Sequence, residues 1–69
     1  MHRDNVSSSN ILSIGYDNNS ETLEIEFHGG AVYQYYNVAQ GVYDSMMAAS
    51  SKGQFLHSQI KDRFPYSRV

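Results

Sequence analysis

Residues 22–28 alternate strictly between hydrophobic and polar side chains, and this run constrains the fold more than any other part of the sequence. Leu23, Ile25 and Phe27 fall at every second position, with charged or polar residues between them. Successive side chains of a strand point to opposite faces, so the run predicts a half-buried β-strand. The Gly29-Gly30 pair that follows can supply the positive φ values of a tight turn, which predicts a hairpin.

Strands are expected on both sides of this run. Apolar residues recur at every second position from Leu12 to Tyr16, and Ile11 is the one apolar residue out of phase. Residues 17–20, Asp-Asn-Asn-Ser, form a turn cluster whose side chains can hydrogen-bond their own backbone. Residues 31–36 are β-branched and aromatic enough to form a third strand. Together these segments predict a three-stranded antiparallel meander.

The register of the second hairpin decides which face carries the tyrosines. A two-residue loop puts Gln34 on the apolar face, whereas a three-residue loop pairs Phe27 with Ala31 and puts Tyr33 and Tyr35 there instead. We expect the three-residue loop, because burying Gln34 without partners would be costly. Tyr33 and Tyr35 are then mostly core residues, with hydroxyls that reach toward a rim.

The hydrophobic period changes from two to helical at Val38. Pairs of apolar residues recur at i and i+4, and the pattern continues to Ala49. Asn37 is expected to cap this first helix.

A second helix is expected to begin at Ser51, because Ser51 and Gln54 have the spacing of a capping box. Pro65 lacks an amide donor and restricts the residue before it, so the helix should end near Arg63. Residues 65–69 are then a tail.

The predicted order β-β-β-α-α is an α+β architecture, in which two α-helices pack on one face of the three-stranded meander. One domain is expected over residues 1–69, with a core of about 5–66 and flexible termini. Glu24 and Glu26 share the polar face of their strand, and we expect them to form an exposed charge pair that keeps the sheet soluble.

Size and composition argue against several classes of function. A chain of 69 residues supports one small core, which leaves little room for a deep active site. There is no cysteine, no apolar run long enough to cross a membrane, and no ligand spacing typical of a metal site. We therefore expect a cytoplasmic, non-catalytic protein with no cofactor, no metal, no membrane association and no small-molecule substrate.

The charge is unevenly distributed. The whole chain carries −2, yet residues 52–69 hold four basic side chains against one acidic one. A pI near 5.8 argues against strong sequence-independent binding to nucleic acid. The aromatic third strand and the basic residues could form a recognition surface, or they could be core tyrosines and a solvated helix face.

The order and spacing of several short segments resemble the KTSC domain, a family named for its occurrence at the C-terminus of some lysyl-tRNA synthetases. The resemblance covers roughly residues 5–66 and implies a bacterial or phage domain of undetermined function. It also implies RNA binding, through the fusion to a tRNA-charging enzyme and the Tyr-x-Tyr centre. Ala39 stands where the family is expected to have a helix-opening proline. The segments that carry the resemblance are Val6–Ile11, Ile14–Asp17, Thr22–Phe27, Tyr33–Tyr35, Val42–Tyr43, Ser51–Gly53 and Phe55–Leu56.

Two hypotheses follow. The first is weak RNA or tRNA binding, in which aromatic rings stack bases and basic side chains meet phosphates. The second is a protein-interaction module or homodimer, in which a strand edge or sheet face pairs with another chain. The candidate nucleic-acid-binding residues are Tyr33, Tyr35, Lys52, Lys61, Arg63 and Arg68.

Overall fold

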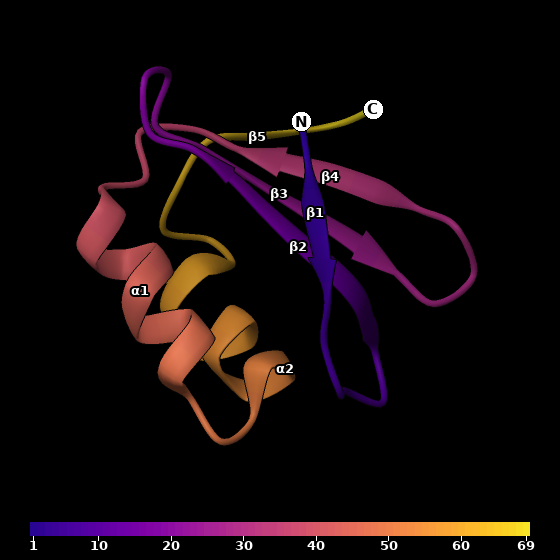
Figure 1. The fold of residues 1–69 in the computed structure, drawn as a ribbon. Helices are drawn as coiled ribbons and strands as arrows, with labels where there is room; N and C mark the ends of the chain where they lie inside the picture. The colour runs from indigo at the N-terminus through magenta and orange to yellow at the C-terminus, as the bar shows by residue number, and fades with distance from the viewer.

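The strands form a single antiparallel sheet in which each strand pairs with the next one along the chain. The computed structural model describes residues 1–69, and the sheet order is β1-β2-β3-β4-β5. Both helices lie on one side of this twisted sheet, as Figure 1 shows. The strands are β1 (Arg3–Asn5), β2 (Ile11–Asp17), β3 (Thr22–Phe27), β4 (Val32–Tyr35) and β5 (Tyr66–Arg68).

The α+β class is confirmed, but the prediction of three strands was wrong, because the sheet has five. The two additional strands, β1 and β5, have three residues each and form its edges. Segments this short carry no alternating pattern, and they become strands by pairing with a neighbour that is already extended. Residues 66–68 are therefore part of the sheet rather than a tail.

The second hairpin has the expected three-residue loop. Tyr33 pairs with Ile25, Tyr35 pairs with Leu23, and the amide of Phe27 donates to the carbonyl of Ala31 at 2.8 Å. The glycines at 29 and 30 adopt φ values of 102° and 99°, as the turn requires. Both tyrosines consequently lie on the face that the helices cover.

In β2 the predicted inward positions were partly wrong. A β-bulge lies between Ile11 and Ser13, so Ile11 pairs with Phe27 and Ser13 with Glu26. Ile11 is fully buried, whereas Leu12 is 36% exposed. The extra residue of the bulge shifts the alternation by one position, which a strict period of two does not anticipate.

The core lies between the sheet and the helices. Tyr16 ties the two layers together, because its hydroxyl donates to the Val38 carbonyl at 2.5 Å and its ring stacks on Tyr43 at 4.8 Å. The buried core residues are Ile11, Ile14, Leu23, Ile25, Tyr35, Val38, Met46, Leu56 and Ile60.

The first helix, α1 (Gln40–Ala48), begins two residues later than expected. Ala39 is its N-cap, whereas Asn37 has a φ of 62° and turns the chain into the helix. Asn tolerates this left-handed conformation better than most residues.

No helix in the chain combines the length and hydropathy needed to cross a membrane.

The second helical segment begins where the sequence predicts. It comprises α2 (Lys52–Phe55) and a π-helical turn, η1 (Leu56–Ile60), and Ser51 Oγ accepts the amide of Gln54 at 3.2 Å. The amide of Lys61 donates to the Leu56 carbonyl at 2.8 Å, which closes the wider turn. The segment ends before Arg63, so the predicted extent was too long.

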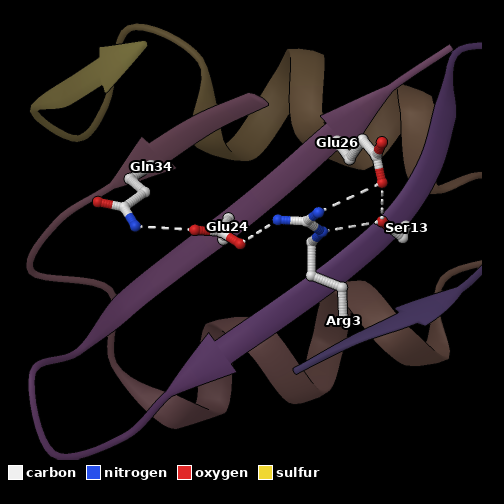
Figure 2. Close-up of polar contacts among 5 residues, drawn as sticks. All are labelled: Arg3, Ser13, Glu24, Glu26 and Gln34. Atoms are coloured by element: carbon white, nitrogen blue, oxygen red, sulfur yellow. Dashed lines mark hydrogen bonds and ion pairs between the residues drawn. The ribbon is translucent and has the colours of Figure 1, made fainter. Parts of the chain in front are cut away.

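The face of the sheet away from the helices carries a polar network, shown in Figure 2. Glu24 is only 6% exposed, so the expectation of an exposed charge pair was wrong. The Arg3 guanidinium, brought over this face by β1, pairs with Glu24 and lies 3.5 Å from Glu26. Ser13 donates to Glu26 at 2.8 Å, and Gln34 donates to Glu24 at 2.8 Å.

Candidate functional site

A cavity of about 450 Å³ lies beside the aromatic side chains of β4 and β5. Its volume falls within the range of small-ligand sites in proteins. We call it the aromatic cavity. The residues that matter for its chemistry are Tyr33 and Tyr35 from β4, Tyr66 from β5, and His57, Lys61 and Asp62 from the second helical segment and the turn after it.

The three tyrosines form one cluster of rings. The centroid of Tyr66 lies 5.9 Å from that of Tyr33 and 5.7 Å from that of Tyr35, and Tyr33 and Tyr35 are 6.5 Å apart. Phe27 extends the cluster with an edge-to-face contact to Tyr33 at 5.7 Å. These separations are typical of favourable aromatic pairs, so each ring helps to hold its neighbours in place.

The rings differ in how much surface they offer to a ligand. Tyr35 is 6% exposed and Tyr33 is partly buried, whereas Tyr66 is 57% exposed. Burial raises the pKa of Tyr35, and the neighbouring Tyr33, Tyr66 and Asp62 raise it further. Tyr35 therefore supports the cluster from beneath as a neutral phenol, and Tyr66 carries the accessible ring.

Two of the four basic candidates lie next to this cluster. Lys61 lines the aromatic cavity, and the β4–β5 register places Arg68 directly opposite Tyr33 on the same face of the sheet. Lys61 and Arg68 are both exposed, so their charges are available to a ligand.

The other two basic candidates lie elsewhere. The ammonium of Lys52 donates to the Ala49 carbonyl at 2.9 Å. Arg63 Nε donates to the Ser58 carbonyl at 3.1 Å, and its side chain lines a different hollow beside α1. The structure thus brings Tyr33, Tyr35 and Lys61 together at one cavity without gathering all four basic side chains there.

Sequence reasoning missed Tyr66, the most exposed ring of the cluster. Tyr66 follows Pro65 in a segment that carries no strand pattern, and only its pairing with Tyr35 brings it to the site. The available signal was a further tyrosine within the basic stretch. No group of three or more histidine, aspartate or glutamate side chains lies close enough to hold a metal ion.

Comparison with known proteins gives consistent results. The model of the KTSC domain family matches residues 7–64. A crystal structure of a KTSC domain protein from Yersinia pestis superposes with a TM-score of 0.93 and 43% identity, covering 99% of this chain and 96% of that one. A protein of Tsukamurella paurometabola is 44% identical over 59 residues, which span 86% of this chain and 88% of that one.

A further relative is much longer than this chain. The lysine–tRNA ligase of Trichormus variabilis is 39% identical over 54 residues, which are 78% of this chain and 10% of that enzyme. The similarity is therefore to a small part of the ligase.

Proposed function

Because the chain belongs to the KTSC domain family, we propose that it is a small non-catalytic module that binds single-stranded RNA weakly, including the single-stranded loops and ends of tRNA. The binding surface is the aromatic cavity and its rim. Sequence-tolerant recognition of single strands combines aromatic rings that stack bases with cations that meet the backbone.

The observation that carries this proposal is the exposed Tyr66 ring, held by two other tyrosines beside Lys61. Stacking a base on the Tyr66 ring would remove apolar surface from contact with water. The neighbouring rings already hold Tyr66 in place, so little conformational entropy is lost when a base binds. A base that stacks on such a ring gains about 1–3 kcal/mol. Arg68, opposite Tyr33, offers a second cation on the same side of the sheet.

The relatives support the same class of ligand. A region similar to this chain occurs in proteins named lysine–tRNA ligase in Trichormus variabilis and Nostoc. A domain that is part of an enzyme of that name would lie close to bound tRNA. RNA is therefore a chemically reasonable partner for this chain.

The charge distribution sets the strength of binding. With a net charge of −2 overall and two cations at the site, electrostatics contribute little. Two phosphate contacts predict a slope of about −1.4 in log affinity against log salt, at about −0.7 per contact on single strands. Weak binding with a shallow salt slope is the expected result.

Fluorescence anisotropy of labelled tRNA and of mixed single-stranded RNA at low salt tests the proposal. Tyr66→Leu keeps apolar bulk and removes the ring, so it should weaken binding by the stacking contribution. Lys61→Ala should weaken binding to all sequences similarly, because phosphate contacts carry no sequence information. Arg63→Ala is the matched control: it removes the same charge away from the cavity and should change affinity least.

No binding of either RNA at protein concentrations of about 100 μM, within the ordinary non-specific range, would remove the nucleic-acid hypothesis. The protein-interaction or homodimer hypothesis would then be preferred. Analytical ultracentrifugation over the same concentrations measures the dimer directly.

A further inference from the structure

A second hollow, with entirely different chemistry, adjoins the aromatic cavity. It encloses about 490 Å³, and no hydrophobic residue lines it. Residues 7–10, residues 50–54 and His57 form its walls, so the serine-rich segment before β2 and the start of α2 line a common space. We call it the serine recess.

Two hydroxyls of the serine recess accept hydrogen bonds from backbone amides and keep their own hydrogens free to donate. Ser8 Oγ accepts the amides of Asn10 and Ile11, both at 3.2 Å, and Ser51 Oγ accepts the amide of Gln54 at 3.2 Å. A serine hydroxyl has one hydrogen to donate besides the lone pairs that accept. Neither Ser8 nor Ser51 donates its hydrogen to another protein group, so both hydrogens are available to a ligand that accepts.

The charge of the serine recess is positive. Lys52 lines it, and no aspartate or glutamate does. The Lys52 ammonium donates one hydrogen bond to the Ala49 carbonyl at 2.9 Å, which fixes its position and leaves two N–H groups unused. A lysine and serine hydroxyls that line one hollow without a carboxylate are suited to an anion, and charge-assisted hydrogen bonds are the strong ones.

Gly53 leaves part of the wall of the serine recess without a side chain. A Cβ at this position would lie 3.7 Å from Ser8 Oγ and 3.9 Å from Asn10 Nδ2, in ordinary contact with both walls. The backbone does not demand glycine there, because Gly53 is helical and has no positive φ. Gly53 is the second residue of α2, and neither a positive φ nor close packing accounts for its missing side chain.

The serine recess and the aromatic cavity are neighbours that share part of their walls. Asn10, Gly53 and His57 line both of them. A ligand that crosses these three shared residues would meet tyrosine rings on one side and serine hydroxyls on the other.

We propose that the serine recess binds the phosphate group of a nucleotide whose base lies against Tyr66 in the aromatic cavity. The position of the base rests on the proposed function, whereas the phosphate contacts to Ser8, Ser51 and Lys52 do not. The same phosphate chemistry occurs in a free mononucleotide and within an RNA strand, and the experiment separates these two sources.

Amide chemical shifts in ¹H–¹⁵N spectra report both ends of the site. We expect adenosine 5′-monophosphate to shift the amides of residues 8, 9, 51, 52 and 54, which line only the serine recess, together with that of Tyr66. Adenosine should shift the Tyr66 amide and leave those of the five recess residues unchanged. The monophosphate should bind at least about tenfold more tightly than adenosine, as expected for hydrogen bonds to a charged group. Equal affinities, or unchanged shifts at residues 8, 9, 51, 52 and 54, would overturn the inference.

Two glycine substitutions give a matched pair. Gly53→Ala puts a methyl group into the serine recess and should reduce affinity for the monophosphate to that for adenosine, with an equal or higher melting temperature. Gly41→Ala makes the same change in α1, where nothing lies within 4 Å of the new Cβ, and should leave affinity unchanged. Parental affinity in Gly53→Ala contradicts the proposed position of the phosphate.

A Lys52→Gln variant removes the charge and should weaken phosphate binding while adenosine binding persists. RNA binding without shifts at residues 8 and 9 would remove this inference and leave the proposed function standing. Monophosphate binding in the serine recess without any affinity for RNA would remove the proposed function and identify a free nucleotide as the ligand.

Discussion

The guanidinium of Arg3 forms an ion pair with the carboxylate of Glu24 across the face of the sheet that the helices leave uncovered, as Figure 2 shows. Burial alone would raise the pKa of Glu24. The hydrogen bonds from Gln34 and Arg3, together with the Arg3 charge, outweigh that effect and lower the pKa below its usual value of 4.5. Glu24 thus remains charged because the adjacent strand β4 and the more distant strand β1 both supply donors to it.

The stability of the protein should therefore depend on pH through Glu24. A carboxyl whose pKa is lowered by folding stabilises the native state above the pKa of the unfolded chain, near 4.5, and that stability is lost as the pH falls through the folded pKa. The free energy of unfolding of the parent protein, measured with urea, should decrease below about pH 4.5. In Glu24→Gln the decrease should be smaller, and a variant with the parental pH profile contradicts the assignment.

Gly15 is required where β1 pairs with β2. A Cβ there would lie 2.6 Å from the His2 carbonyl oxygen and 2.9 Å from Arg3 Cγ. Gly15→Ala should displace β1 and cost about 1–3 kcal/mol, the usual range for overpacking. Hydrogen exchange of residues 3–5 should accelerate more than that of β3. Uniform acceleration along the chain would instead indicate a global effect.

The Tyr16 hydroxyl satisfies the carbonyl of Val38, a fully buried residue at the approach to α1. Tyr16→Phe keeps the ring stacked on Tyr43 and leaves that carbonyl without this donor. An unsatisfied buried acceptor costs about 1–3 kcal/mol, measurable by chemical denaturation. Tyr36→Phe is a suitable control, because the Tyr36 hydroxyl donates to the Gln34 side chain rather than to a buried backbone group.

The stability lost when a core side chain is truncated to alanine should depend on how deeply that side chain is buried rather than on its size. Ile25 is fully buried at the centre of the sheet, so Ile25→Ala should cost about 2–5 kcal/mol. Phe27 lies on the same face but is only partly buried near the hairpin end. Phe27→Ala should therefore cost less than its larger side chain implies. The reverse order of melting temperatures would place the centre of the core at the hairpin end.

The central part of the fold could be predicted because its signals are local. The strict alternation in residues 22–28 fixes the inward face of β3, and the cost of burying Gln34 selects the register of β4. Ser51 and Gln54 mark the start of the second helical segment through a contact between residues three apart. Each of these signals depends only on nearby residues.

The remaining features depend on contacts between distant residues. Glu24 is buried because Arg3 reaches it from β1. The alternating pattern of β3 contains no information about that distant partner. Tyr66 joins the aromatic cavity only through its pairing with Tyr35. The bulge that buries Ile11 and exposes Leu12 likewise requires the partner strand to be present. Sequence patterns predict elements, whereas these features require knowledge of how the elements meet.

The pairing of β5 with β4 has a kinetic consequence for the aromatic cavity. The other strand pairs join neighbours across short turns, whereas this one joins residues 33–35 to residues 66–68 across both helices. The entropy of closing a loop grows with its length, so the last strand should dock late in folding and detach first from the native state. Detachment carries Tyr66 away, and only the docked fraction of molecules is then competent to bind. A ligand bound at Tyr66 stabilises the docked state of β5 in turn. It should therefore slow hydrogen exchange in β5 more than anywhere else in the sheet.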